Sequence, residues 1–206
     1  MKALLHLQLK NNGVSILFIL ILTFVISLLF AQDEDGMSIA IYALIFSMNS
    51  YRSFSLLKDQ KMRYFIHSLP IARREIVTAI YGSTLFYISI IYLVLLPTQI
   101  YRGFYQNEVE DFLIPFAGLF AVSIASAALE IYLNFRSNDF KESMTDSLLS
   151  LFGALFFILL PHMGLLLWNH EPSFYLRLLI LPIISMLLFH FSLKKSISLY
   201  ETKEVF

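Results

Sequence analysis

The chain has 206 residues, of which 58% are hydrophobic and 15% charged, and its formal net charge is zero. Soluble domains are about half apolar and about a quarter charged, so this composition excludes an ordinary soluble domain and indicates a membrane protein with several spans. The lack of cysteine excludes disulfides, thiol catalysis and cysteine metal sites. The balanced charge gives no indication of nucleic-acid binding.

A short amphipathic stretch, residues 1–12, begins the chain. Lys2, His6 and Lys10 form one polar stripe at helical spacing, opposite leucines. The same residues also alternate as in a strand, but a lone strand leaves its backbone groups unpaired at a bilayer. We therefore expect a helix lying in the membrane interface, with its lysines toward anionic headgroups.

Six stretches are apolar and long enough to cross a bilayer, which takes about 20 helical residues. They are 14–31, 37–57, 76–100, 112–133, 148–168 and 174–193. The first is longer than the hydrophobic region of a signal peptide and lacks a small-residue cleavage site, so we expect it to be retained. The predicted fold is an all-α membrane protein, a single transmembrane domain over residues 1–206 with six transmembrane helices.

Basic residues are distributed unevenly between the two sides of this topology. With both termini inside, all of the 15 lysine and arginine residues except Arg102 and Arg177 fall on the inner side. Outer connections carry acidic residues such as Glu108 and Glu110. Because lysine and arginine mark cytoplasmic loops, the N- and C-termini are predicted to be cytoplasmic.

The fourth predicted span is rich in small residues. Ala117, Ala121 and Ala125 recur every four positions, with Ser123 and Ser126 nearby. Small residues let helix backbones approach closely in lipid. This pattern favours tight packing, either inside the bundle or against a second copy of the chain.

Three polar residues within the predicted spans are candidates for function: Asn49, Arg52 and Glu130. Arg52 and Glu130 lie at similar depth, near the cytoplasmic ends of the second and fourth spans. Three interpretations stay open. The charges form an ion pair or reach the interface, they line a gate or cavity together with Asn49, or Glu130 couples transport to protons.

No catalytic or metal-binding motif accompanies these residues. The histidines are scattered, and neither GxSxG nor a pair of intramembrane catalytic carboxylates is present. The phosphate-binding motif GxxxxGK[ST] is also absent from the sequence, so any ATP that drives this protein must be bound by another subunit. We expect no metal or cofactor in this chain.

A basic segment, residues 58–75, connects the second and third predicted spans. Its apolar residues recur every three or four positions, which predicts an amphipathic helix. Pro70 ends that helix, because the residue before proline avoids helical dihedral angles, and it suits the first turn of the next helix. A topology signal needs only charge, whereas a bent amphipathic hairpin is typical of a docking element for a cytoplasmic partner.

The end of this segment resembles a motif of the ABC-2 type permeases, the membrane subunits of ATP-driven exporters. Between their second and third spans these proteins often read SLPxSRxEIVxAKY, and residues 68–81 read SLPIARREIVTAIY. Ala72 stands where serine is common, and Ile80 where lysine is common. Chain length, six predicted spans and the interfacial N-terminal helix also agree with the family.

The resemblance implies that residues 58–75 form a coupling helix and hairpin seated in a groove of a separate P-loop ATPase, which binds ATP and magnesium. Two ATPase copies would pair with two permease chains, a homodimer rather than a heterodimer, in a bacterial cytoplasmic membrane. The size is most similar to exporters of amphipathic peptides, such as phenol-soluble modulins, with self-protection against antimicrobial peptides as a neighbouring role. The residues implied to contact the ATPase are Met62, Arg63, Phe65, Ile66, Leu69, Pro70, Arg73 and Arg74.

Three other functions compete with this interpretation. The substrate-binding subunit of a vitamin importer has a similar size and helix number, but it does not need the basic hairpin. A proton-coupled secondary transporter would use Glu130 as its proton site. A plain membrane anchor would leave Asn49, Arg52 and Glu130 without a purpose.

Overall fold

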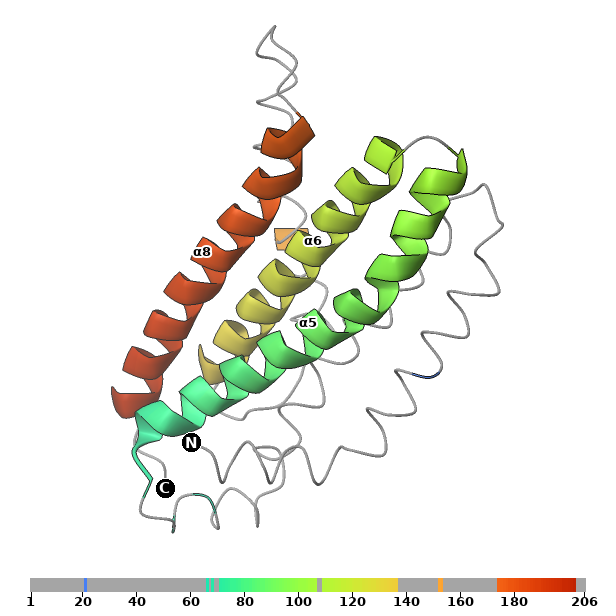
Figure 1. Cartoon of the computed structure of the whole chain (residues 1–206). Coiled ribbons are helices and arrows are strands. Elements are labelled where there is room, and N and C mark those ends of the chain that lie inside the picture. The colour runs from blue at the N-terminus through green and yellow to red at the C-terminus, as the bar shows by residue number, and fades with distance from the viewer. Residues whose placement is uncertain are drawn as a thin grey trace, which may run out of the picture.

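The computed structural model describes residues 21, 66, 68, 71–106, 109–136, 152–153 and 174–202. Three long helices contain most of them: α5 (Arg73–Gln106), α6 (Val109–Arg136) and α8 (Phe174–Thr202), as Figure 1 shows. Each holds a stretch long and apolar enough to cross a membrane, Arg73–Tyr101, Leu113–Arg136 and Leu179–Thr202. The predicted helices over 76–100, 112–133 and 174–193 are therefore confirmed.

All three helices are longer than the predicted spans. α5 begins at Arg73 and ends at Gln106, and α8 continues to Thr202. The prediction marked only residues apolar enough for the hydrocarbon layer, whereas helical hydrogen bonding continues into the polar flanks. The predictions for 1–12, 14–31, 37–57 and 148–168 lie outside the described residues, apart from Ile21 and the pair 152–153, which are helical.

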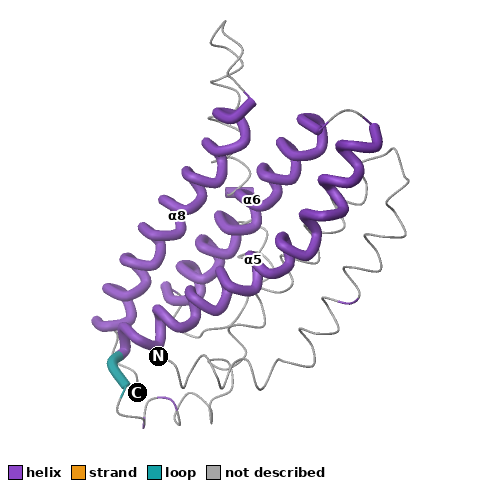
Figure 2. The backbone as a smooth tube through the Cα atoms, viewed as in Figure 1, coloured by secondary structure: helices purple, strands orange, loops and turns teal. Residues whose placement is uncertain are grey.

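α6 packs against both other helices, most extensively against α8. α5 runs antiparallel to α6 and α8, and its first turns approach the last turns of α8 (Figure 2). The start of α5 and the ends of α6 and α8 therefore meet. We call this region the basic end of the bundle, because it holds most of the described basic residues: Arg73, Arg74, Arg136, Lys194 and Lys195.

Small side chains allow α6 to fit closely between its neighbours. Ala121, Ala125 and Ala128 are fully buried inside the chain, while Ala117 is partly buried. Gly118 faces Leu181 of α8, whose Cδ1 atom would lie 3.8 Å from an added Cβ atom. The predicted small-residue packing is thus found within the chain itself, where the short side chains bring helix backbones together.

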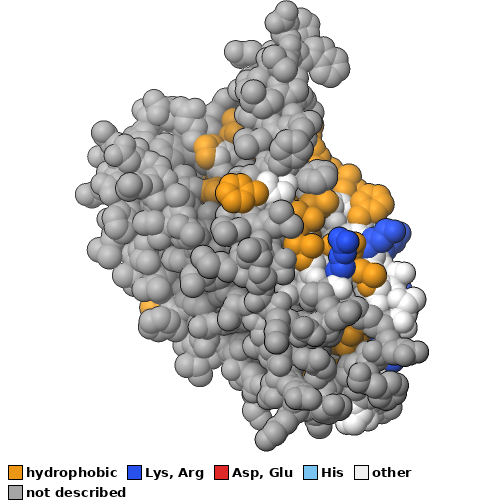
Figure 3. Space-filling view, turned by 180° about the vertical axis from the view of Figure 1, so that it is seen from behind, with side chains coloured by type: hydrophobic (Ala, Val, Ile, Leu, Met, Phe, Trp, Pro, Cys, Tyr) orange, Lys and Arg blue, Asp and Glu red, His pale blue; other side chains and the backbone are white. Residues whose placement is uncertain are grey.

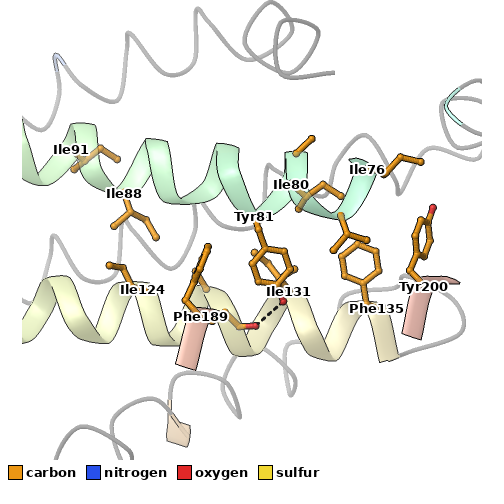
Figure 4. Close-up of a cluster of buried hydrophobic side chains, with 14 of the residues drawn as sticks. Ile76, Ile80, Tyr81, Ile88, Ile91, Ile124, Ile131, Phe135, Phe189 and Tyr200 are labelled. Atoms are coloured by element: carbon orange, nitrogen blue, oxygen red, sulfur yellow. Dashed lines mark hydrogen bonds between the residues drawn. The ribbon is translucent and has the colours of Figure 1, made fainter. Parts of the chain in front are cut away.

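One cluster of buried apolar side chains joins the three helices (Figure 4). Isoleucines of α5 face isoleucines of α6, and Phe189 of α8 packs edge-on against Tyr81 of α5 with ring centroids 5.1 Å apart. The labelled members are Ile76, Ile80, Tyr81, Ile88, Ile91, Ile124, Ile131, Phe135, Phe189 and Tyr200. Because lipid tails are as apolar as these side chains, close packing and dispersion hold the cluster together.

α8 keeps a broad exposed face. Leu179, Ile183, Leu187 and Phe191 are exposed at four-residue spacing, and Lys194 follows at the basic end. Figure 3 shows apolar side chains of the described residues with lysine or arginine side chains beside them. This order fits contact with lipid tails followed by contact with headgroups.

Candidate functional site

The segment that enters α5 contains the end of the motif found in the sequence. Ile71 and Ala72 are not helical, and the carbonyl oxygen of Ala72 accepts from the backbone N–H groups of Glu75 at 2.8 Å and Ile76 at 3.4 Å. Ala72 is therefore the N-cap residue of α5. α5 itself begins at Arg73. Pro70, which was expected in the first turn of this helix, lies outside the described residues.

Alanine is a poor N-cap because it has no side-chain oxygen to accept from the free N–H groups of the first turn. Glu75 stands three residues after Ala72, the spacing of a capping box. We expect Ala72→Thr to stabilise the start of α5 by about 0.5–1 kcal/mol. Thermal unfolding in detergent measures this. Valine has the shape of threonine without its hydroxyl, so Ala72→Val should not raise the stability. Equal stabilisation by both variants would contradict the role of the cap.

Arg73 contacts the last turn of α8. Its Nη1 atom donates to the backbone oxygens of Tyr200 at 3.4 Å and Glu201 at 3.3 Å. The last turn of a helix has carbonyls without intrahelical partners, and a cation there is favourable. α8 has no basic residue in its own last turn, so Arg73 supplies this charge from another helix.

The entering segment is also held by apolar contacts. Ile66 is 2% exposed and belongs to the core cluster, and Ile71 packs against the same cluster. Within it, Phe135 of α6 and Tyr200 of α8 meet edge-on with ring centroids 5.2 Å apart. Ile66 was expected on a partner-facing surface. It is instead buried in the core of its own chain.

A cluster of hydroxyl groups connects the three helices, further from the basic end than Phe135 and Tyr200. The hydroxyl of Tyr81 lies 2.7 Å from Ser192 Oγ, 2.8 Å from Ser196 Oγ and 3.5 Å from the carbonyl oxygen of Ala128. Ser192 Oγ also donates to the Ala128 carbonyl at 2.6 Å. All of these side chains are buried, so the cluster ties α5, α6 and α8 together where water does not compete.

Removing the Tyr81 hydroxyl should therefore weaken the bundle. Hydrogen bonds between membrane helices contribute about 0.6 kcal/mol on average and up to about 1.7, so we expect Tyr81→Phe to cost roughly 1 kcal/mol. Tyr87→Phe is the matched control on the same helix, because the Tyr87 hydroxyl is buried without a hydrogen-bond partner in the described part of the chain. It should be neutral or slightly stabilising. Equal loss from both variants would contradict the role of the cluster.

Glu130 lies in α6 and is only 3% exposed. One turn further, Asn134 is equally buried, and its Nδ2 atom donates to the backbone oxygen of Glu130 at 3.0 Å. Asn134 thus bonds the α6 backbone and leaves the Glu130 carboxyl group to other interactions. The burial of an ionisable group in a membrane span keeps Glu130 a functional candidate.

The remaining candidates lie outside the described residues: Asn49, Arg52, Met62, Arg63, Phe65, Leu69 and Pro70. Arg74 is described and exposed, next to Arg73. No group of three or more His, Cys, Asp or Glu side chains in the described ranges is arranged to hold a metal ion.

The candidate residues expected from the sequence do not include Tyr81, Ser192, Ser196 or Tyr200. A signal was present, since Ser185, Ser192 and Ser196 fall on one face of an otherwise apolar span, and all three are buried. Polar residues repeated on one face of a membrane helix indicate contact with a neighbouring helix. Their partner on α5, Tyr81, lies more than a hundred residues earlier in the chain. It is the last residue of the motif at residues 68–81, but the motif does not indicate which helix it contacts.

Long apolar helices joined through small residues and buried hydroxyl groups define a multi-pass membrane protein. The family model described as ABC-2 family transporter protein matches residues 4–201. The chain therefore belongs to the ABC-2 transporter family and is a membrane permease component of such a transporter. No curated protein and no solved structure matches the chain.

Proposed function

We propose that this chain is the membrane-spanning subunit of an ATP-driven exporter and that a separate P-loop ATPase supplies the hydrolysis. The family match over residues 4–201 carries this proposal. The sequence has no phosphate-binding motif of its own, which supports a separate ATPase. Two permease chains, as a homodimer, and two ATPase chains holding ATP and magnesium make up the proposed transporter.

The contact with the ATPase is assigned to residues 58–75, from Lys58 to Glu75. The described part of this segment supports a docking element fixed to the bundle, because Ile66 is buried while Ser68, Ala72 and Arg74 are exposed. Met62, Arg63, Phe65, Leu69 and Pro70 complete the proposed contact surface. Movement of the ATPases on binding ATP would push this segment.

The proposed location is a bacterial cytoplasmic membrane, with both termini and the basic end toward the cytoplasm. Lysine and arginine in the described helices support this orientation, because Lys194 and Lys195 follow the apolar face of α8. The proposed substrates are amphipathic or hydrophobic peptides, with toxin export and self-protection as the two roles. This assignment rests on the resemblance to small peptide exporters.

Family membership favours the permease over the binding subunit of a vitamin importer. Proton-coupled transport keeps one supporting observation, the buried Glu130 in α6. The two energy sources separate these functions, since a proton-coupled transporter works without ATP and stops when the proton gradient is dissipated.

The test is transport in vesicles that contain the permease purified together with its ATPase. The probe is a fluorescent amphipathic helical peptide of about 20 residues, long enough to span the hydrocarbon layer. We expect peptide movement that requires ATP and continues in the presence of a protonophore. A partner ATPase with its P-loop lysine replaced is the control and should abolish movement. Movement that follows a proton gradient without ATP would contradict the proposal and point to Glu130.

A further inference from the structure

The first turn of α5 contains two adjacent arginines, Arg73 and Arg74. The N-terminus of a helix is its positive end, so basic residues there are unfavourable for α5 itself. Glu75 is the acidic residue of that turn and offsets part of this repulsion. For Arg73, a group outside α5 offsets more of it.

The last turn of α8 is that group. Its carbonyl oxygens form the negative end of the helix dipole, and the turn contains acidic Glu201 but no basic residue. The hydroxyl of Thr202 donates to the carbonyls of Ser198 and Leu199, both at 3.0 Å. Arg73 donates to the next two carbonyls, those of Tyr200 and Glu201, at 3.4 and 3.3 Å. Thr202 and Arg73 together thus bind the terminal carbonyls of α8.

This contact joins two segments of different kinds. Arg73 lies near the end of residues 58–75, the segment that the proposed function assigns to the ATPase contact. α8 is a membrane span whose other end lies at the opposite side of the bundle (Figure 1). Further along α5, the hydroxyl of Tyr81 bonds to the hydroxyls of Ser192 and Ser196 of α8. Between these levels, Tyr200 packs against Phe135 of α6. The start of α5 is therefore fastened to α8 at two levels.

We propose that Arg73 is a positioning residue that fastens the C-terminal turn of α8 to the coupling segment, so that α8 moves together with this segment when the ATPase displaces it. The movement driven by the ATPase rests on the proposed function. The contact between Arg73 and the last turn of α8 does not depend on it. In this proposal the two adjacent arginines have different roles. Arg73 binds within the chain, and exposed Arg74 is left for the partner surface.

The guanidinium group is suited to this task. Its Nη1 atom carries two N–H groups in the plane of the guanidinium and donates to both carbonyl oxygens. The shorter side chain of lysine ends in a compact ammonium group without this planar geometry. Loss of the fork frees the last turn of α8, which then frays, while the core of the bundle is unchanged. The structural consequence is confined to residues 198–202.

The test is hydrogen exchange of the full complex, measured by mass spectrometry for Arg73→Gln, Arg73→Lys and two controls, Arg74→Gln and Lys195→Gln. Lys195 is an exposed cation on α8 itself. We expect faster exchange in residues 198–202 for Arg73→Gln, an intermediate effect for Arg73→Lys, and no change in this turn for either control. Unchanged exchange in Arg73→Gln would overturn the fastening.

The same preparations test whether movement of the ATPase reaches α8 through Arg73. In Arg73→Gln the ATPase should remain bound and active, but peptide transported per ATP should fall about tenfold, within the usual range of coupling between sites. Trapping with ATP and vanadate should change exchange in residues 198–202 of the wild type and not of Arg73→Gln. Loss of the ATPase from Arg73→Gln would show that Arg73 contacts the partner, and would overturn the proposal. If the wild-type chain brings no ATPase, the proposed function and the transmission fail together, whereas the exchange comparison without nucleotide still decides the fastening.

Discussion

Truncating Phe135 to alanine is expected to lower the free energy of unfolding by about 3 kcal/mol, at the lower end of the range for buried aromatic residues. Phe135 is fully buried and meets Tyr200 edge-on, where α6 and α8 both end. The gain from leaving water is small between membrane helices, so the loss comes from the cavity and from missing dispersion contacts. Unfolding in detergent, followed by the loss of helical circular dichroism, measures this change.

Phe191→Ala is the matched control for this prediction. Phe191 is 64% exposed on the face of α8 that fits lipid, so its truncation should change stability by less than about 0.5 kcal/mol. Similar losses in the two variants would show that the basic end is not packed as described.

Reversing the charge at Glu130 is expected to have an effect of the same size. Glu130 is almost completely buried, and the sequence places Arg52 at similar depth on the second predicted span. If the two form an ion pair, Glu130→Arg and Arg52→Glu each leave a charge uncompensated in the membrane and cost about 3–5 kcal/mol. The double exchange should restore part of this loss, because it restores the pair.

The readouts for the exchange are thermal stability in detergent and ATP-driven peptide movement. A control combines Arg52→Glu with Glu201→Arg, which places the arginine at an exposed site at the end of α8 and should give no rescue. Failure of the double exchange to improve on the single variants would remove the ion pair. The cavity-wall and proton-site interpretations of Glu130 would then be the ones left.

The membrane-crossing helices were predictable because length and hydropathy are local properties. Apolar runs over 76–100, 112–133 and 174–193 each contain enough residues to cross a bilayer. Their ends were not predictable in this way, since α8 continues over Lys194 and Lys195 to Thr202. The tight packing of α6 was predictable because alanines at four-residue spacing form a face of small side chains, which lets a neighbouring helix approach closely.

The contacts at the basic end were beyond the reach of a local pattern. Tyr81 ends the motif at residues 68–81, but nothing in the motif indicates its partners. Only the antiparallel arrangement of α5 and α8 places Ser192 and Ser196 beside it. The resemblance to the ABC-2 permeases implies that Arg73 contacts the ATPase. Its bond to the end of α8 depends on backbone carbonyls, which no residue type marks.

The most direct test of the central claim is purification of this chain from its native membrane in mild detergent, with mass spectrometry of the proteins that accompany it. A permease that depends on a separate ATPase predicts a P-loop ATPase in equal amount with the chain. The Tyr87→Phe variant, whose change lies in α5 outside residues 58–75, should retain that partner. A chain that purifies alone or only with copies of itself, and whose transport follows a proton gradient, would contradict the account.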